Sequence, residues 1–152
     1  MRRRARGIGR EYVHVAIDAY SRVVYAEMLP DERAPQTSAF QARAVAWYAT
    51  LGVPVKAGLT DNGGMYRSMR WAQTIRRLRL THKRTRPYTP PTNGKVERVI
   101  RTRLTEWAYA PPDPTSHHRA EWLPRYLHEY NRDRAHSALH YLPPMLGLAQ
   151  AL

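Results

Sequence analysis

Pro87-Tyr88-Thr89-Pro90-Pro91-Thr92-Asn93-Gly94-Lys95-Val96-Glu97-Arg98 is the stretch that decides the fold of this chain. Its prolines exclude a helix over residues 87–91, and a long helix is predicted to begin near Thr92 and to end near Tyr109. Glu97 then lies one turn inside that helix, on the flank of an apolar stripe, with cationic side chains around it. We therefore expect the helix to pack on a sheet and Glu97 to reach the edge of that sheet.

The segments on either side of this stretch alternate between strand-like and helix-like patterns. The expected elements, in chain order, are strands at 12–18 and 22–29, a helix opened by Pro35, a short buried strand at 53–60, a helix capped by Ser68, a strand at 80–84, the long helix, and a helix capped by Ser116 that Pro124 kinks or restarts. This order predicts a mixed α/β layer fold. The 152 residues suffice for one domain, with a basic arm at 1–10, a core at 11–131 and a basic tail at 132–152.

The composition indicates a polyanionic partner. The formal net charge is +13, from 25 Lys and Arg against 12 Asp and Glu, which favours nucleic acid over an anionic membrane surface. Almost all the cations are arginines, which suits phosphate binding, although a GC-rich genome would produce the same bias. The absence of cysteine excludes disulfides and thiolate zinc sites, and no acid is placed to complete a zinc site at His136 and His140. No apolar run is long enough to span a membrane.

Two acids stand out within this basic chain. Asp61 follows the strand predicted at 53–60, and 35 residues separate it from Glu97. Carboxylates that converge at strand and helix ends can hold Mg²⁺, which takes oxygen ligands, for phosphoryl transfer. The alternatives are structural: Asp61 would stabilise an Asp-Asn-Gly turn, and Glu97 would pair with Arg101 one turn along the helix. Asp18, at the end of the first strand, is expected to cap a turn.

Four motifs in order carry a resemblance to a known family. They are Asp18-Ala19-Tyr20-Ser21-Arg22, Thr60-Asp61-Asn62-Gly63-Gly64, the stretch from Tyr88 to Arg98, and Tyr130-Asn131-Arg132-Asp133-Arg134-Ala135-His136-Ser137-Ala138-Leu139. Together they resemble the core of bacterial insertion-sequence transposases of the retroviral-integrase superfamily, over essentially all of residues 11–146. The 35-residue gap between Asp61 and Glu97 matches the acid spacing of that family.

The resemblance implies a fold, a reaction and a set of site residues. The implied fold is ribonuclease H-like, and the implied reaction cuts and joins DNA ends with two Mg²⁺ or Mn²⁺ ions held by an Asp, Asp, Glu triad. Asp61 corresponds to the second Asp and Glu97 to the Glu, as catalytic residues and metal ligands. The residues that the resemblance places on DNA are Lys83, Arg84, Arg86, Asn93, Lys95, Arg98 and Arg101. The implied partners are DNA and a second copy or a full-length transposase, in the bacterial cytoplasm at the nucleoid.

The sequence departs from the family pattern at its start. The family's first Asp lies in a strand that would pair centrally, between the hairpin and the strand ending at Asp61, and this sequence begins after it. Asp18 matches a turn motif of the family, and we do not expect it to substitute. Transfer activity is therefore expected to be absent or severely impaired unless an in-frame upstream segment supplies the strand. The alternatives are a non-catalytic DNA-binding remnant that modulates a full-length relative, and an RNA-binding protein with chance acids.

Overall fold

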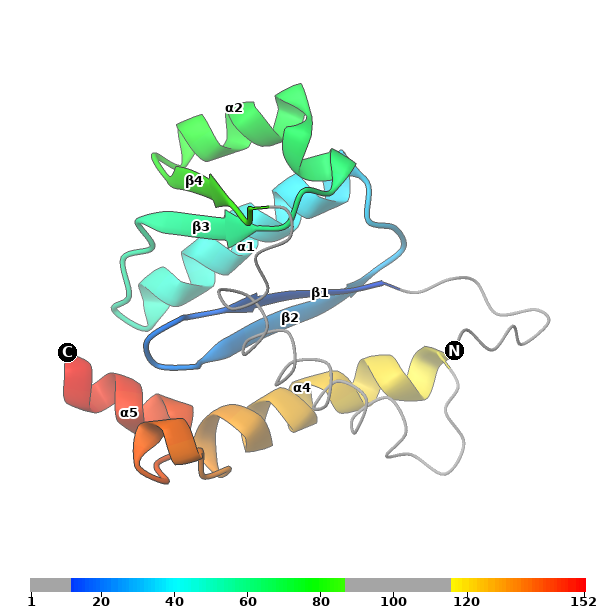
Figure 1. The fold of residues 1–152 in the computed structure, drawn as a ribbon. Helices are drawn as coiled ribbons and strands as arrows, with labels where there is room; N and C mark the ends of the chain where they lie inside the picture. Colours follow the sequence, from blue (N-terminus) through cyan, green and yellow to red (C-terminus); the bar gives the residue numbers. More distant parts are fainter. Residues whose placement is uncertain (1–11, 87–115) are drawn as a thin grey trace.

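The computed structural model describes residues 12–86 and 116–152 (Figure 1). Its elements, in chain order, are β1 (Tyr12–Ile17), β2 (Val24–Leu29), α1 (Ala34–Thr50), β3 (Ala57–Thr60), the 3₁₀ helix η1 (Gly64–Arg67), α2 (Met69–Arg77), β4 (Thr81–Arg84), α4 (Ser116–Arg132), the 3₁₀ helix η2 (Ser137–Leu139) and α5 (Pro144–Ala151). The predicted mixed α/β fold is confirmed. The predicted long helix from Thr92 to Tyr109 lies outside the described residues.

Strands β1 and β2 form the predicted antiparallel hairpin, with Tyr12 opposite Leu29 and Ile17 opposite Val24. The carboxylate of Asp18 closes the turn, because its Oδ2 accepts hydrogen bonds from the Ser21 backbone N–H at 2.7 Å and the Ser21 hydroxyl at 2.6 Å. Arg22 has a φ of 64°, in the left-handed region, so it cannot extend the strand. The second strand therefore begins at Val24, two residues later than predicted.

The hairpin is covered by helices on both faces. Successive side chains of each strand point to opposite faces, so each helix packs on a different set of residues. Val24 and Ala26 point to α4, where they pack with Leu123 and Tyr130. Tyr25 lies on the opposite face and packs with residues of α1. Figure 1 shows α4 and α1 on opposite sides of the hairpin.

Helix α1 begins beside Pro35, as predicted, and turns one face to the core. A proline stands in its first turn, and Phe40, Ala44 and Tyr48 are buried. Gly52 follows the helix with a φ of 78°, the left-handed conformation common just past a helix end. The Tyr48 hydroxyl donates to the backbone oxygen of Val23 at 2.8 Å, and burial raises the pKa of this phenol. The C-terminal end of α1 is thereby anchored to the hairpin turn.

Strands β3 and β4 pair in parallel, with Ala57 opposite Thr81 and Thr60 opposite Arg84. The prediction of a buried strand over 53–60 is wrong in its length and its burial, since Leu59 is 49% exposed. Within the described residues, β3 pairs with β4 on one edge only, and no strand lies between β3 and β1. Val53 and Val55 instead reach the core from irregular chain before the strand.

Helix α2 covers the β3–β4 pair. The Ser68 hydroxyl accepts a hydrogen bond from the Trp71 backbone N–H at 3.1 Å, which confirms the predicted cap. Trp71 and Ile75 then pack with Leu80, which leads into β4. The cap and the strand were both predicted from the sequence.

Helix α4 continues through Pro124, so the prediction that this proline restarts the helix is wrong. The side chain of Pro124 is exposed, and the packing of Leu123 and Tyr130 on β2 holds the helix on both sides of it. Residues 132–152 fold against the rest, because Leu148 of α5 packs with Val23 and Tyr48. No helix in the described ranges is long and apolar enough to cross a membrane.

Candidate active site

Asp61 lies directly after β3, in a loop tied to the end of β4. Asp61 Oδ1 accepts a hydrogen bond from the Gly63 backbone N–H at 2.8 Å. The Asn62 side-chain amide donates to the Thr85 backbone oxygen at 2.9 Å. A Cβ at position 63 would approach the Met65 sulfur to 2.5 Å and Asp61 Oδ1 to 3.0 Å, so a larger residue there would require these side chains to shift. The strand end therefore fixes one carboxylate oxygen of Asp61 in a tight turn.

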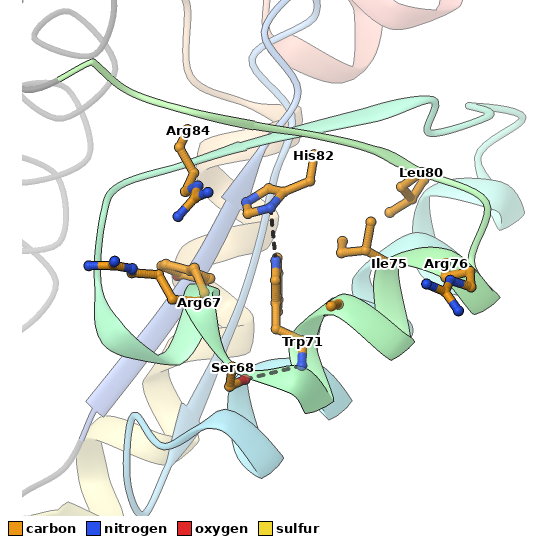
Figure 2. A pocket seen from close by; sticks show the side chains of 10 residues that line it. Arg67, Ser68, Trp71, Ile75, Arg76, Leu80, His82 and Arg84 are labelled. Carbon is orange, nitrogen blue, oxygen red and sulfur yellow. Dashed lines mark hydrogen bonds between the residues drawn. The ribbon is translucent and has the colours of Figure 1, made fainter.

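Three arginines surround a pocket next to this loop (Figure 2). The pocket has a volume of about 570 Å³ and is lined by Arg84 at the end of β4, Arg67 of η1 and Arg76 of α2. All three side chains are exposed, and none forms an ion pair with the described part of the chain. Arginines without acidic partners, held around one cavity, are suited to binding phosphate oxygens.

The wall of the pocket is aromatic and half-buried. Trp71 Nε1–H donates to His82 Nδ1 at 3.3 Å, and His82 Nε2 lies 2.8 Å from Thr60 Oγ1. Burial, and secondarily the charge of Arg84, lowers the pKa of His82, which keeps the imidazole neutral. Burial also raises the pKa of Tyr66, with the carboxylates of Asp61 and Glu32 adding to the effect.

Asp61 and Asp18 lie at opposite ends of α1. The negative charges of Asp61 and Glu32 both contribute to the raised pKa of Tyr66, so both carboxylates are near this phenol. Glu32 lies just before the first residue of α1. The Asp18 turn contacts Tyr48 near the other end of this helix, whose 17 residues rise about 25 Å. Metal ions that act together are about 4 Å apart. Asp18 and Asp61 therefore lie too far apart to hold the same pair of metal ions.

The fit of a divalent metal ion to this edge rests on Asp61. Its side chain is exposed, and Oδ2 has no hydrogen-bond partner among residues 12–86 and 116–152, so a hard cation could take that oxygen. Those residues contain no group of three Asp, Glu, His or Cys side chains that could hold a metal. Glu97, the predicted second ligand, lies outside them.

The predicted DNA-binding residues divide into three sets. Arg84 lies at the site, beside Thr60 and the Asp61 loop. Lys83 is exposed, and strand alternation turns it to the other face of β4, while Arg86 is exposed just beyond the strand. The remaining predicted residues, Asn93, Lys95, Arg98 and Arg101, lie outside the described ranges.

Four contributors to the site were not predicted: Thr60, Arg67, Trp71 and His82. Trp71 is one of four tryptophans, and His82 is one of seven scattered histidines, so their composition alone does not mark them. One sequence signal could have found His82. It shares a strand face with Arg84, two residues on, and both follow a helix whose cap fixes Trp71. Arg67 carries no comparable signal.

Comparison with known proteins identifies relatives. The profile of a family described as Integrase core domain matches residues 3–90, and a second profile with that description matches residues 78–144. The Intracisternal A-particle Pol-related polyprotein of mouse intracisternal a-particle MIA14 is 38% identical over 95 residues, which are 62% of this chain and 10% of that protein. Transposase InsD for insertion element IS2A/D/F/H/I/K of Escherichia coli is 35% identical over 92 residues, 60% of this chain and 31% of that protein.

Solved structures share the fold. The catalytic core domain of BIV integrase superposes with a TM-score of 0.74 at 23% identity, over 95% of this chain and 89% of that one. The HTLV-2 integrase catalytic core domain, a dimeric form in complex with magnesium, gives 0.62 at 17% identity, over 88% and 81%. These likenesses confirm the predicted ribonuclease H-like fold. Because one family profile covers more than half of its residues, the chain belongs to the integrase core domain family.

Proposed function

We propose that this chain is a DNA transposition or integration core, of the class that transfers polynucleotide ends with Mg²⁺ or Mn²⁺. One observation carries the proposal: Asp61 presents an exposed carboxylate at the end of β3, where Thr60 pairs with Arg84. Arg84 and Arg67 line one pocket and form no ion pair with the described residues. A carboxylate suits a hard cation, and the arginines suit the phosphates of a polyanion. Membership of the family supports the same chemistry.

In this proposal Asp61 and Glu97 hold the metal, and the arginines hold the DNA backbone. Bound divalent ions would supply a more reactive attacking oxygen and a stabilised leaving oxygen. Asp61 keeps Oδ2 available for that role, since Oδ1 is bonded within the turn. The HTLV-2 relative in complex with magnesium supports the choice of metal.

The net charge of +13 supports DNA as the partner, with affinity that falls steeply as salt rises. The HTLV-2 catalytic core is described as a dimeric form, which supports assembly of this chain with a second copy or with a full-length transposase. The aligned segments cover only 10% and 31% of the two relatives described above. We also propose that the chain acts in the bacterial cytoplasm, at the nucleoid; the bacterial origin of the transposase relative supports this proposal.

We further propose that these 152 residues, assayed by themselves, transfer strands poorly or not at all. The support is that Asp18 is committed to a turn at the far end of α1. A non-catalytic DNA-binding role, exerted on a full-length relative by mixed assembly, is the second candidate. The pocket arginines, which form no ion pair with the described residues, favour this second candidate equally, because they can bind DNA whether or not catalysis follows.

One experiment separates these functions. The chain, Asp61→Asn and Glu97→Gln are incubated with labelled DNA ends and Mn²⁺ or Mg²⁺, and both binding and strand transfer are measured. We expect salt-dependent DNA binding by all three and transfer near background. Efficient transfer that either substitution abolishes would establish the catalytic role and refute the impairment. Binding to RNA and not to DNA would overturn the whole proposal.

A further inference from the structure

A continuous chain of hydrogen bonds runs from the interior of the protein to the backbone of Asp61. It begins at the indole of Trp71, which is only 2% exposed, and passes to His82 Nδ1 at 3.3 Å. His82 Nε2 lies 2.8 Å from Thr60 Oγ1, and the Thr60 hydroxyl donates to the Asp61 backbone oxygen at 3.0 Å. These hydrogen bonds thus link α2, β4 and β3 to the backbone oxygen of Asp61.

The chemistry of the groups fixes the direction of every bond in this chain. An indole N–H can only donate, so His82 Nδ1 must be the acceptor. In a neutral imidazole the proton then sits on Nε2, which donates to Thr60 Oγ1. The Thr60 hydroxyl, having accepted that bond, is free to donate its own hydrogen to Asp61. A buried tryptophan therefore selects the tautomer of His82, and His82 orients the hydroxyl of Thr60.

These bonds complete the restraint on Asp61. Its backbone oxygen is held by Thr60, and its Oδ1 is held by Gly63. Oδ2 is the polar side-chain atom of Asp61 left without a partner in the described ranges. The end of β3 would therefore be held in place before a metal ion binds, with Oδ2 of Asp61 available to coordinate that ion.

We propose that His82 is a positioning residue for Asp61, acting through Thr60. The inference rests on the proposed function, in which Asp61 is a metal ligand. Outer partners that orient a ligand typically change metal affinity about 10–100-fold when they are removed. His82 would act in this way without touching the metal or the DNA. Its side chain shares the pocket with Arg84, yet its two nitrogens are both used within the protein.

The test compares pairs of variants that differ by one hydrogen-bonding group. Thr60→Val keeps the branched shape and removes the hydroxyl, whereas Thr60→Ser keeps the hydroxyl. His82→Phe keeps an aromatic ring against Trp71 and removes both nitrogens, whereas His82→Gln keeps an adjacent acceptor and donor. Mn²⁺ affinity is measured by the EPR signal of free Mn²⁺, with circular dichroism to confirm folding and DNA binding as a second readout.

We expect Thr60→Val and His82→Phe to weaken Mn²⁺ binding about 10–100-fold, and Thr60→Ser and His82→Gln to stay within a few-fold of wild type. DNA binding, measured without divalent metal, should change less than Mn²⁺ binding in Thr60→Val and His82→Phe. The serine and glutamine rescue distinguishes positioning from general packing, and the Thr60 pair decides the question if His82→Phe fails to fold. Wild-type Mn²⁺ affinity in folded Thr60→Val would overturn the inference.

Asp61→Asn separates this inference from the proposed function. If Asp61→Asn binds Mn²⁺ as tightly as wild type, the metal role of Asp61 is wrong and the proposed function fails with it. If Asp61→Asn loses Mn²⁺ while Thr60→Val and His82→Phe do not, only the positioning role of His82 is refuted.

Discussion

Asn131 and Val24, 107 residues apart in the chain, are joined by two hydrogen bonds. The Val24 N–H donates to Asn131 Oδ1 at 2.8 Å, and Asn131 Nδ2 donates to the Val24 oxygen at 2.8 Å. The side-chain amide thus pairs with the first residue of β2 as a neighbouring strand would. It fastens the end of α4 to the hairpin, and it explains structurally why an asparagine stands within the Tyr130–Leu139 motif.

Replacing Asn131 with alanine should destabilise the chain strongly. The side chain is buried, and its loss leaves both backbone groups of Val24 without partners. At roughly 1–3 kcal/mol for each of the two buried groups left unsatisfied, we expect the free energy of unfolding to fall by about 2–6 kcal/mol. Urea unfolding checks this, with the exposed neighbour variant Arg132→Ala as the control. Equal stability of the two variants would refute the structural role of Asn131.

The two arginines beside Asp61 should contribute to DNA binding through their guanidinium groups, which pair with phosphates. Removing one phosphate-binding cation lowers the slope of log affinity against log salt by about 1. We expect Arg67→Gln and Arg84→Gln each to weaken binding to any duplex sequence and to reduce that slope. Arg132→Gln is the matched control, because Arg132 is an exposed arginine at the end of α4 and does not line the pocket. A slope unchanged by the Arg67→Gln, Arg84→Gln double variant would remove the pocket from the DNA interface.

Stability should fall on acidification through His82. The folded protein holds the pKa of His82 below its ordinary value of 6.5, mainly by burial and then by Arg84, so the unfolded chain binds the proton more tightly. The contribution of neutral His82 is therefore complete above about pH 6.5 and declines as the pH falls towards the folded pKa. Protonation also turns Nδ1 into a donor facing the Trp71 N–H. Arg67, Arg76 and Arg84 line the same pocket and oppose the added charge.

Urea midpoints at about pH 7.5 and about pH 5.5 test this effect of His82 protonation. Wild type should lose more stability between the two pH values than His82→Gln, in which the side chain does not titrate. The other six histidines are common to both proteins, so the difference between them isolates His82. An equal loss in both would contradict the assignment of a neutral, hydrogen-bonded imidazole.

Local patterns were sufficient to predict most of the elements. The Ser68 cap, the Pro35 start of α1 and Gly52 past its end depend on neighbours within a few residues, so they are readable from sequence. The strand before Asp61 was not predicted correctly, because its burial depends on which strands pair with it. The predicted restart of the helix at Pro124 was also wrong, because the packing of α4 on β2 on both sides of Pro124 keeps the helix continuous.

The site divides in the same way. Asp61 became a candidate because its spacing from Glu97 matches a family pattern, and the turn-capping role of Asp18, confirmed by its hydrogen bonds to Ser21, was predicted from its local motif. The hydrogen bonds from Trp71 through His82 to Thr60 join three elements that are separated in sequence. No local pattern encodes that meeting. It emerges only when β3 and β4 pair in parallel and α2 packs across them.

The most direct test of the account is Mn²⁺ binding by wild type, Asp61→Asn and Asp133→Asn, measured by EPR at constant ionic strength. Asp133 is an exposed carboxylate near His128 on α4, so its variant carries the same change of charge away from the site. We predict that Asp61→Asn weakens Mn²⁺ binding more than about 100-fold, beyond the effect of an outer partner, while Asp133→Asn binds as wild type does. Wild-type affinity in Asp61→Asn, or an equal loss in both variants, would contradict the assignment of Asp61 as the metal ligand.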